Sequence, residues 1–196
     1  MNIFKEMWDI AIKLSNIKNM SEINTNGRKY DKHGFLFDLK TQVEQLDLFY
    51  TKLVDENLKH NPNETFYVLR NEPNVHQMAY INLGHGYPKE LFGGHWCYIL
   101  RKFRTKYLVI PSTSDDNTDI GINEDSEIPI KIKKFINNKY TTLQVRNLRC
   151  VDIQRVYKNK GYYDVETESK YIVDKLMSII TKDIFGEDID IIEKEA

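Results

Sequence analysis

The stretch "KELFGGHWCYILRKFRTKYLVIPSTSDD", residues 89–116, decides the fold of this chain. It holds two runs rich in β-branched and aromatic residues on either side of a short basic turn, and this pattern predicts a β-hairpin with strands at 95–102 and 106–112. In a hairpin, the start of the first strand and the end of the second lie at the same edge of the sheet. We therefore expect His95, which follows a Gly-Gly turn, to face Thr113 and to form a site with it.

Further short runs of the same kind flank this hairpin and are separated by turn-forming residues. They lie at 66–70, 77–83, 128–135 and 141–153. Strands at this spacing predict a small, strongly bent antiparallel β-barrel, which we assign to a domain spanning residues 65–196. A C-terminal helix is predicted from about residue 166 to residue 184, because apolar residues there line one helical face: Tyr171, Ile172, Leu176, Ile179 and Ile180.

The N-terminal part of the chain, residues 1–64, predicts a helical hairpin that extends the barrel domain. Its first helix has an apolar stripe at helical spacing: Phe4, Met7, Trp8, Ala11 and Leu14. Its second helix, after a polar loop at 21–34, has a heptad-like seam: Leu36, Leu39, Val43, Leu46, Tyr50 and Leu53. We expect this seam to be buried, either against the first helix or against a partner chain.

Composition narrows the class of protein. The chain has 196 residues, of which 41% are hydrophobic and 29% are charged, and this balance is typical of a globular domain. The formal net charge of -1 argues against a global positive field for nucleic acid, although a local basic patch is compatible with it. No apolar run approaches the roughly 20 residues that cross a bilayer, and the N-terminus lacks the pattern of a signal peptide. We therefore expect a cytoplasmic protein without a membrane partner.

Three blocks of the sequence, taken in order, carry a family resemblance. The first is the loop Asn82-Leu83-Gly84 with Glu90, and the second is the Gly-Gly turn followed by two strands that end at Thr113. The third is TTLQVRNLRCVDIQRV at 141–156. Together they resemble the core of the MazF/PemK-like toxins, the endoribonucleases of bacterial toxin–antitoxin modules, over roughly residues 66–185. The resemblance implies an SH3-like barrel with a C-terminal helix, RNA as substrate, a cognate antitoxin, a homodimer and no cofactor.

The chain departs from the family pattern at four positions. His95 stands where the family has its arginine, and Trp96 replaces the proline that follows it. Asn82 replaces the loop aspartate, and Pro88 replaces the second loop glycine. An arginine cannot release its proton, whereas a histidine can act as a base or an acid near neutral pH. The exchange at His95 therefore replaces charge stabilisation with proton transfer.

Metal-free RNA cleavage needs a base, an acid and donors that stabilise the charged phosphate. We assign catalysis to His95, Thr113 and Glu90, with Glu90 orienting His95 or serving as the second acid–base group. Substrate binding is assigned to the turn, the strand end and two cations: Gly93, Gly94, Ser114, Arg149 and Arg101. The residues His76, His85, His95 and Cys97 match no familiar zinc spacing, so no metal is expected.

Simpler interpretations stay open beside these. His95 could be a strand-end histidine that bonds a backbone carbonyl, and Arg149 could form a structural ion pair with Asp152. At the level of function, the alternative is a non-catalytic MazF-like module that binds nucleic acid or protein and uses the helical hairpin as its interaction surface.

Overall fold

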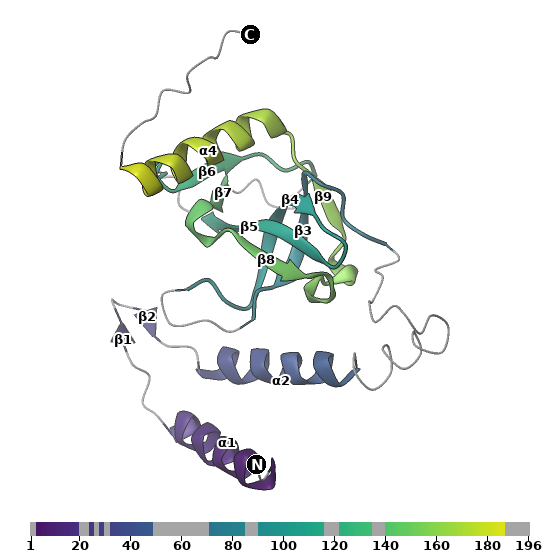
Figure 1. The fold of residues 1–196 in the computed structure, drawn as a ribbon, viewed down its shortest axis with the longest axis vertical. Helices are drawn as coiled ribbons and strands as arrows, with labels where there is room; N and C mark the ends of the chain where they lie inside the picture. The colour runs from purple at the N-terminus through teal and green to yellow at the C-terminus, as the bar shows by residue number, and fades with distance from the viewer. Residues whose placement is uncertain are drawn as a thin grey trace.

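The structure is a computed structural model, and it describes residues 3–19, 24–25, 28–29, 32–48, 71–84, 90–115, 122–134 and 140–186. It combines helices with an antiparallel sheet of seven strands, so the predicted α+β class is confirmed. The C-terminal helix α4 lies along one side of the sheet, and the N-terminal helices α1 and α2 lie toward the other (Figure 1).

The hairpin at the centre of the sheet is confirmed. Strands β4 (Gly94–Lys102) and β5 (Lys106–Asp115) pair in antiparallel register, with Cys97 opposite Pro111 and Ile99 opposite Val109. An irregularity between Ile99 and Arg101 shifts the register near the turn. Such a bulge bends and twists a strand pair locally.

Strand β5 has different neighbours along its two halves. Its first half, residues 106–109, pairs with β8 (Arg149–Asp152), and its second half, residues 112–115, pairs with β7 (Tyr140–Gln144). The single strand predicted at 141–153 is therefore wrong. The chain must move from one end of β5 to the other, and it does so through the 3-10 turn η2 (Val145–Asn147).

The strand order is β6-β7-β5-β4-β3-β9, with β8 on β5, so the sheet is not closed into the predicted barrel. The outer strands are β6 (Glu127–Ile130), which is shorter than predicted, and β9 (Tyr162–Asp164), beside β3 (Gln77–Asn82). Two isolated bridges lie beyond these ladders. Ile81 pairs with Val156, after the 3-10 turn η3 (Ile153–Arg155), and Ile132 pairs with Val165.

The sheet buries apolar residues on both faces, because adjacent residues of a strand point to opposite sides. One cluster contains Ala79, Ile81, Leu83, Cys97, Ile99, Tyr107, Val109, Val151, Ile153 and Val156. The other contains Met78, Tyr98, Ile110, Ile128, Ile130, Leu143 and Val145, together with three residues of α4: Ile172, Leu176 and Ile179. The predicted C-terminal helix is thus confirmed as α4 (Ser169–Phe185), which covers the second face.

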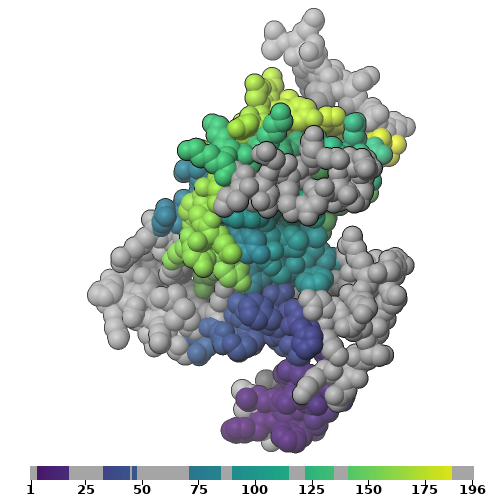
Figure 2. All heavy atoms as spheres, turned by 180° about the vertical axis from the view of Figure 1, so that it is seen from behind, coloured from purple at the N-terminus to yellow at the C-terminus, as the bar shows by residue number. Residues whose placement is uncertain are grey.

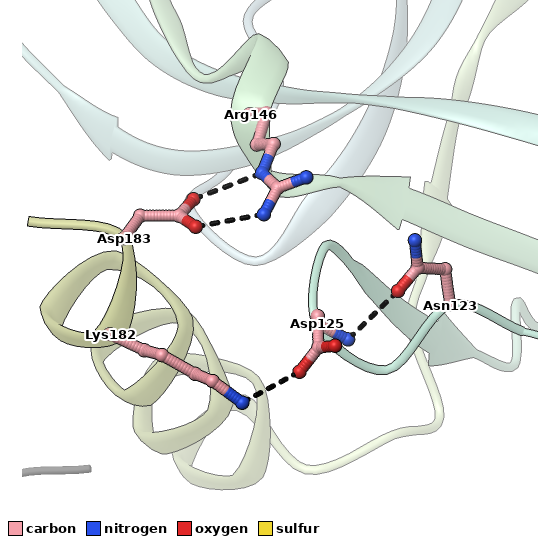
Figure 3. Close-up of polar contacts among 5 residues, drawn as sticks. All are labelled: Asn123, Asp125, Arg146, Lys182 and Asp183. Carbon is pink, nitrogen blue, oxygen red and sulfur yellow. Dashed lines mark hydrogen bonds and ion pairs between the residues drawn. The ribbon is translucent and has the colours of Figure 1, made fainter. Parts of the chain in front are cut away.

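Ion pairs fasten the last turn of α4 to the sheet (Figure 3). Arg146 binds Asp183 through two hydrogen bonds, Nε to Oδ2 at 3.0 Å and Nη2 to Oδ1 at 2.8 Å. Lys182 Nζ lies 2.9 Å from Asp125 Oδ1 in the turn before β6. The hydrogen bond to Arg146 lowers the pKa of Asp183 and in turn raises the pKa of Arg146.

The N-terminal segment forms helices α1 (Ile3–Asn19) and α2 (Lys32–Leu48), with the short pair β1 (Asn24–Thr25) and β2 (Arg28–Lys29) between them. Within this chain the predicted seam is only partly buried, because Leu36 and Leu39 are half-buried whereas Val43 is 57% exposed and Leu46 is 48% exposed. Burial of Val43 and Leu46 against the first helix is therefore wrong, and burial against a partner chain stays a prediction. In Figure 2, α2 lies against the strands and α1 lies beyond it.

Some predictions fall outside the described residues. They include the strand at 66–70 and the seam positions Tyr50 and Leu53. In contrast, β9 and the 3-10 turn η4 (Lys158–Lys160) lie where no element was predicted. In the part of the chain that the structure describes, no helix has both the length and the hydropathy to cross a membrane.

Candidate functional site

The glycine-rich turn before β4 is tied to the end of β3 by backbone hydrogen bonds. The Leu83 amide donates to the Gly93 carbonyl at 2.8 Å, and the Gly93 amide donates to the Gly84 carbonyl at 2.7 Å. Gly84 and Gly93 have φ values of 79° and 74°, a region that favours glycine over residues with a Cβ. The buried Asn82 side chain accepts from the Gly84 amide at 2.8 Å and so holds the loop end in place.

His95 follows this turn, and both of its ring nitrogens face backbone carbonyls. Nε2 lies 2.9 Å from the Phe92 oxygen, and Nδ1 lies 3.4 Å from the Ser112 oxygen. A carbonyl only accepts hydrogen bonds, so a ring nitrogen donates to one only when it carries the hydrogen, and the shorter contact favours the tautomer with the hydrogen on Nε2. The carbonyl contact is the one expected of a strand-end histidine.

Thr113 lies across from His95, because the β4–β5 register, continued past its last pair, places these two residues opposite each other. The Thr113 hydroxyl accepts a hydrogen bond from Gln144 Nε2 at 2.9 Å and lies 3.2 Å from the Thr142 hydroxyl. Gln144 Nε2 also lies 2.9 Å from Glu127 Oε1. This network holds the Thr113 hydroxyl in place, and in its contact with Thr142 either hydroxyl can be the donor.

A pocket of about 280 Å³ opens at the same end of the two strands. Its lining residues come from five strands or bridges of the sheet: Tyr80, Gly94, His95, Trp96, Ser112, Thr113, Ser114, Ile132 and Thr141. Four of the residues assigned to the site from the sequence line this pocket together, namely Gly94, His95, Thr113 and Ser114. Gly94 lies directly under the Tyr80 ring, since a Cβ added there would be 2.5 Å from the Tyr80 hydroxyl.

Strand alternation separates the two halves of this site. His95 and Thr113 have the parity of Cys97 and Val109, so their side chains point to the face of the first apolar cluster. Trp96 has the parity of Tyr98 and packs on the second cluster. The candidate catalytic side chains and the aromatic wall of the pocket therefore lie on opposite faces of one sheet end.

Helix α2 brings an acidic residue to the turn. Asp38 Oδ2 is 3.1 Å from the position that a Cβ on Gly93 would occupy. Burial, and after it the negative charge of Asp38, raise the pKa values of Tyr80 and Tyr157. Gly93, proposed to bind substrate, thus sits beside a carboxylate.

The two proposed cations lie away from the pocket. Arg101 follows His95 by six residues on β4, or about 20 Å along a strand. Arg149 pairs with Val109, four residues before Thr113 on β5, or about 13 Å away.

Arg149 is close enough to the His95 face of the sheet to affect Cys97, which lies on that face. Burial raises the pKa of the Cys97 thiol, and the positive charge of Arg149 acts in the opposite direction. Its guanidinium donates to the Asn147 carbonyl at 3.3 Å, while Asp152 accepts from the Gln154 amide at 2.9 Å. The Arg149–Asp152 ion pair that we considered is thus replaced by two separate local contacts.

Glu90 is an exposed residue before the turn, and its role toward His95 stays a prediction. Among the described residues, no group of three or more His, Cys, Asp or Glu side chains could hold a metal ion. His76 instead bonds the Tyr98 hydroxyl through Nδ1 at 2.7 Å, at the opposite end of β3 from His95. His85 is outside the described residues.

Sequence reasoning missed the residues that support Thr113, and it did not identify the aromatic wall of the pocket. Thr142 and Gln144 alternate with the buried Leu143 and Val145. From this alternation, a row of polar side chains on one face of the strand could have been predicted beside Thr113. The contact between Tyr80 and Trp96 depends on their pairing across β3 and β4, which no local pattern reveals.

In comparisons with known proteins, no family model matches the chain, and no curated protein matches it either.

Proposed function

We propose that this protein is a toxin of the MazF/PemK type, a metal-independent endoribonuclease that cleaves single-stranded RNA. The observation that carries the proposal is the meeting of His95 and Thr113 at one strand end, beside the Gly93-Gly94 turn. The fold supports it through the Ile81–Val156 and Ile132–Val165 bridges, which bring the sheet toward the SH3-like barrel of that family.

In this reaction, the 2′-oxygen of a nucleotide forms a bond to the adjacent phosphorus, and the bond from phosphorus to the 5′-oxygen breaks. A base takes the 2′-hydroxyl proton, and an acid protonates the departing 5′-oxygen, which leaves a 2′,3′-cyclic phosphate and a 5′-hydroxyl. His95 exchanges a proton at Nδ1, and Glu90 is the candidate for the second proton transfer.

The remaining groups bind the phosphate. Thr113 accepts from Gln144 and can donate its own hydrogen to a phosphate oxygen. In the proposal, the phosphate lies next to the Gly93-Gly94 turn, where Tyr80 covers Gly94 and Asp38 lies beside Gly93. Ser114 is exposed at the end of the strand, and Arg149 and Arg101 bind more distant parts of the RNA.

The partners in this proposal are RNA, a cognate antitoxin and a second copy of the chain. Support for a protein partner comes from α1, where Phe4 is 79% exposed and Trp8 is 70% exposed. Apolar residues gathered on one exposed surface are typical of interaction sites. The N-terminal helices, expected as a hairpin, are the proposed docking element for the antitoxin.

The test is incubation of the full-length protein with a long mixed-sequence RNA in EDTA, followed by labelling of new 5′-hydroxyl ends. His95→Ala should lower the rate by about 10²–10⁴, the range for loss of a general acid or base. His33→Ala, which removes an exposed histidine of α2, is the matched control and should leave the rate unchanged. His95→Arg restores the family's cation without the exchangeable proton, so a fully active His95→Arg variant would show that His95 acts only as a charge.

One observation favours a second candidate, the non-catalytic binding module. Both His95 nitrogens face carbonyl oxygens, so the ring must turn before Nδ1 can reach a substrate. RNA that is bound but never cut, by the natural protein and by His95→Ala alike, would support the module and contradict the nuclease.

A further inference from the structure

A row of four aromatic rings crosses the sheet beside the pocket. Tyr163 lies 5.1 Å from Trp96, Trp96 lies 5.3 Å from Tyr80, and Tyr80 lies 5.5 Å from Tyr157, measured between ring centroids. Each of the four side chains is half-buried, so each keeps part of its surface exposed. Lys160 adds a cation at 5.5 Å from the centre of the Tyr80 ring.

The pocket lies against the middle of this row. Tyr80 and Trp96 form its aromatic wall, and the hydroxyl-bearing residues Ser114 and Thr141 lie among its other lining residues. The Ser112 hydroxyl donates to the Trp96 carbonyl at 2.8 Å and so fixes the strand beneath the wall. A volume of about 280 Å³ is at the small end for ligand pockets, and it suits one flat ring system.

We propose that this pocket holds one unpaired base of the RNA, the base next to the phosphate that lies at His95 and Thr113. The inference rests on the proposed function. Aromatic rings bind unstacked bases of single-stranded RNA by stacking, and nearby hydroxyls hydrogen-bond the polar base edges. The pocket offers both features, on strands that also carry the candidate catalytic residues.

The pocket wall and the candidate catalytic residues lie on opposite faces of the sheet, so the bound base and its phosphate would also lie on opposite faces. The Trp96 side chain lies on the face of the second apolar cluster, and His95 points to the opposite face. The RNA strand therefore passes around the end of β4 and β5, with the base on one side and the phosphate on the other. Lys160, beside Tyr80, binds the backbone as it leaves the pocket.

Asp38 opposes this binding. Its charge acts on Tyr80 and Tyr157, and it lies against Gly93, so it repels an incoming phosphate. Asp38→Asn should therefore tighten RNA binding, and the effect should shrink as salt rises. Asp47→Asn, nine residues further along α2 near its C-terminal end, is the matched control and should change RNA binding much less.

The experiment uses Trp96 as its own reporter. The chain has two tryptophans, so Trp8→Phe on α1 leaves Trp96 as the single source of tryptophan fluorescence. Short RNAs with 2′-O-methyl groups cannot be cleaved by 2′-hydroxyl attack, and their binding is followed in parallel by the anisotropy of a dye on the RNA. We expect Trp96 fluorescence to change with the same midpoint as the anisotropy.

Substitutions then test the contacts. Trp96→Leu should weaken binding about 5- to 150-fold, which corresponds to the loss of one base–aromatic stack. Tyr171→Leu, which removes an aromatic residue that is 41% exposed on α4, should change it less than about twofold. Thr141→Val keeps the side-chain shape, removes the hydroxyl and should alter the preference among the four homopolymer RNAs.

The outcomes separate the two proposals. RNA that binds at saturation without changing Trp96 fluorescence overturns the base pocket, and cleavage of natural RNA in the same preparation would leave the nuclease intact. A Trp96 response without any cleavage supports the pocket and removes the nuclease. If RNA neither binds nor is cut, both proposals fail.

Discussion

Gly94→Ala tests the geometry of the pocket wall most directly. The added Cβ would lie 2.5 Å from Oη, 2.7 Å from Cζ and 2.6 Å from Cε1 of Tyr80, all closer than real Cβ contacts. The Tyr80 ring must therefore move, which disturbs its contacts with Trp96 and Tyr157. Overpacking of this kind costs about 1–3 kcal/mol of the free energy of unfolding.

A gain partly offsets this cost. Gly94 does not have a positive φ, so alanine fits the backbone, and replacing a strand glycine stabilises by about 0.5–1 kcal/mol. The net loss should be about 0–2.5 kcal/mol, and the melting temperature should fall by about 0–10 °C for a chain of this size. Chemical denaturation of both proteins measures the difference in the free energy of unfolding.

The control is the same substitution after Tyr80→Ala, which removes the ring that the new methyl group meets. In that background, Gly94→Ala should stabilise the protein by about 0.5–1 kcal/mol, so the effect changes sign. Equal destabilisation in both backgrounds would refute the placement of the Tyr80 ring over Gly94.

Three further predictions concern other parts of the chain. The Arg146 hydrogen bond lowers the pKa of Asp183, so this carboxylate stabilises the fold above its unfolded pKa and the effect is lost as pH falls. The difference in melting temperature between the natural protein and Asp183→Asn should therefore shrink from neutral pH to about pH 3. A constant difference would contradict the role of the Arg146–Asp183 pair in holding α4 to the sheet. The exposed Cys150 should react with a thiol reagent in the native protein while the buried Cys97 does not, because burial raises the pKa of the Cys97 thiol; Cys150→Ser should abolish the fast reaction. Leu46→Asp should change the free energy of unfolding by less than about 0.5 kcal/mol when the protein is dilute and monomeric, because Leu46 is 48% exposed, and a loss of several kcal/mol at concentrations where the protein associates would mean that a partner chain buries it.

The central hairpin could be predicted because its information is local. The runs on either side of the basic turn are apolar, their central residues are buried, and the turn residues separate them. Helix α4 was predictable for the same reason, since Ile172, Leu176 and Ile179 recur at helical spacing and are buried. In both cases, the local pattern and the tertiary packing agree.

The break between β7 and β8 could not be predicted in this way. The apolar alternation continues from Leu143 to Val145, and Leu148 follows, so the run resembles one strand. The break exists because β5 pairs with β7 and β8 at its two ends, which is a property of the whole sheet. The burial of the α2 seam could not be predicted for a related reason. A heptad pattern indicates that a helix packs against a partner, but it does not identify that partner.

From the sequence, we placed the catalytic and the substrate-binding residues in one site around His95. The alternation of side chains along β4 separates these residues onto two faces of the sheet. Residues 94 to 96 alternate between faces, so a histidine that points to Cys97 cannot share a face with the tryptophan that follows it. A ligand that uses both must therefore pass around the end of β4, next to Gly94. Gly94 has the parity of Trp96 and lies under the Tyr80 ring, so a methyl group there would displace Tyr80 from the aromatic wall and leave the His95 face unchanged.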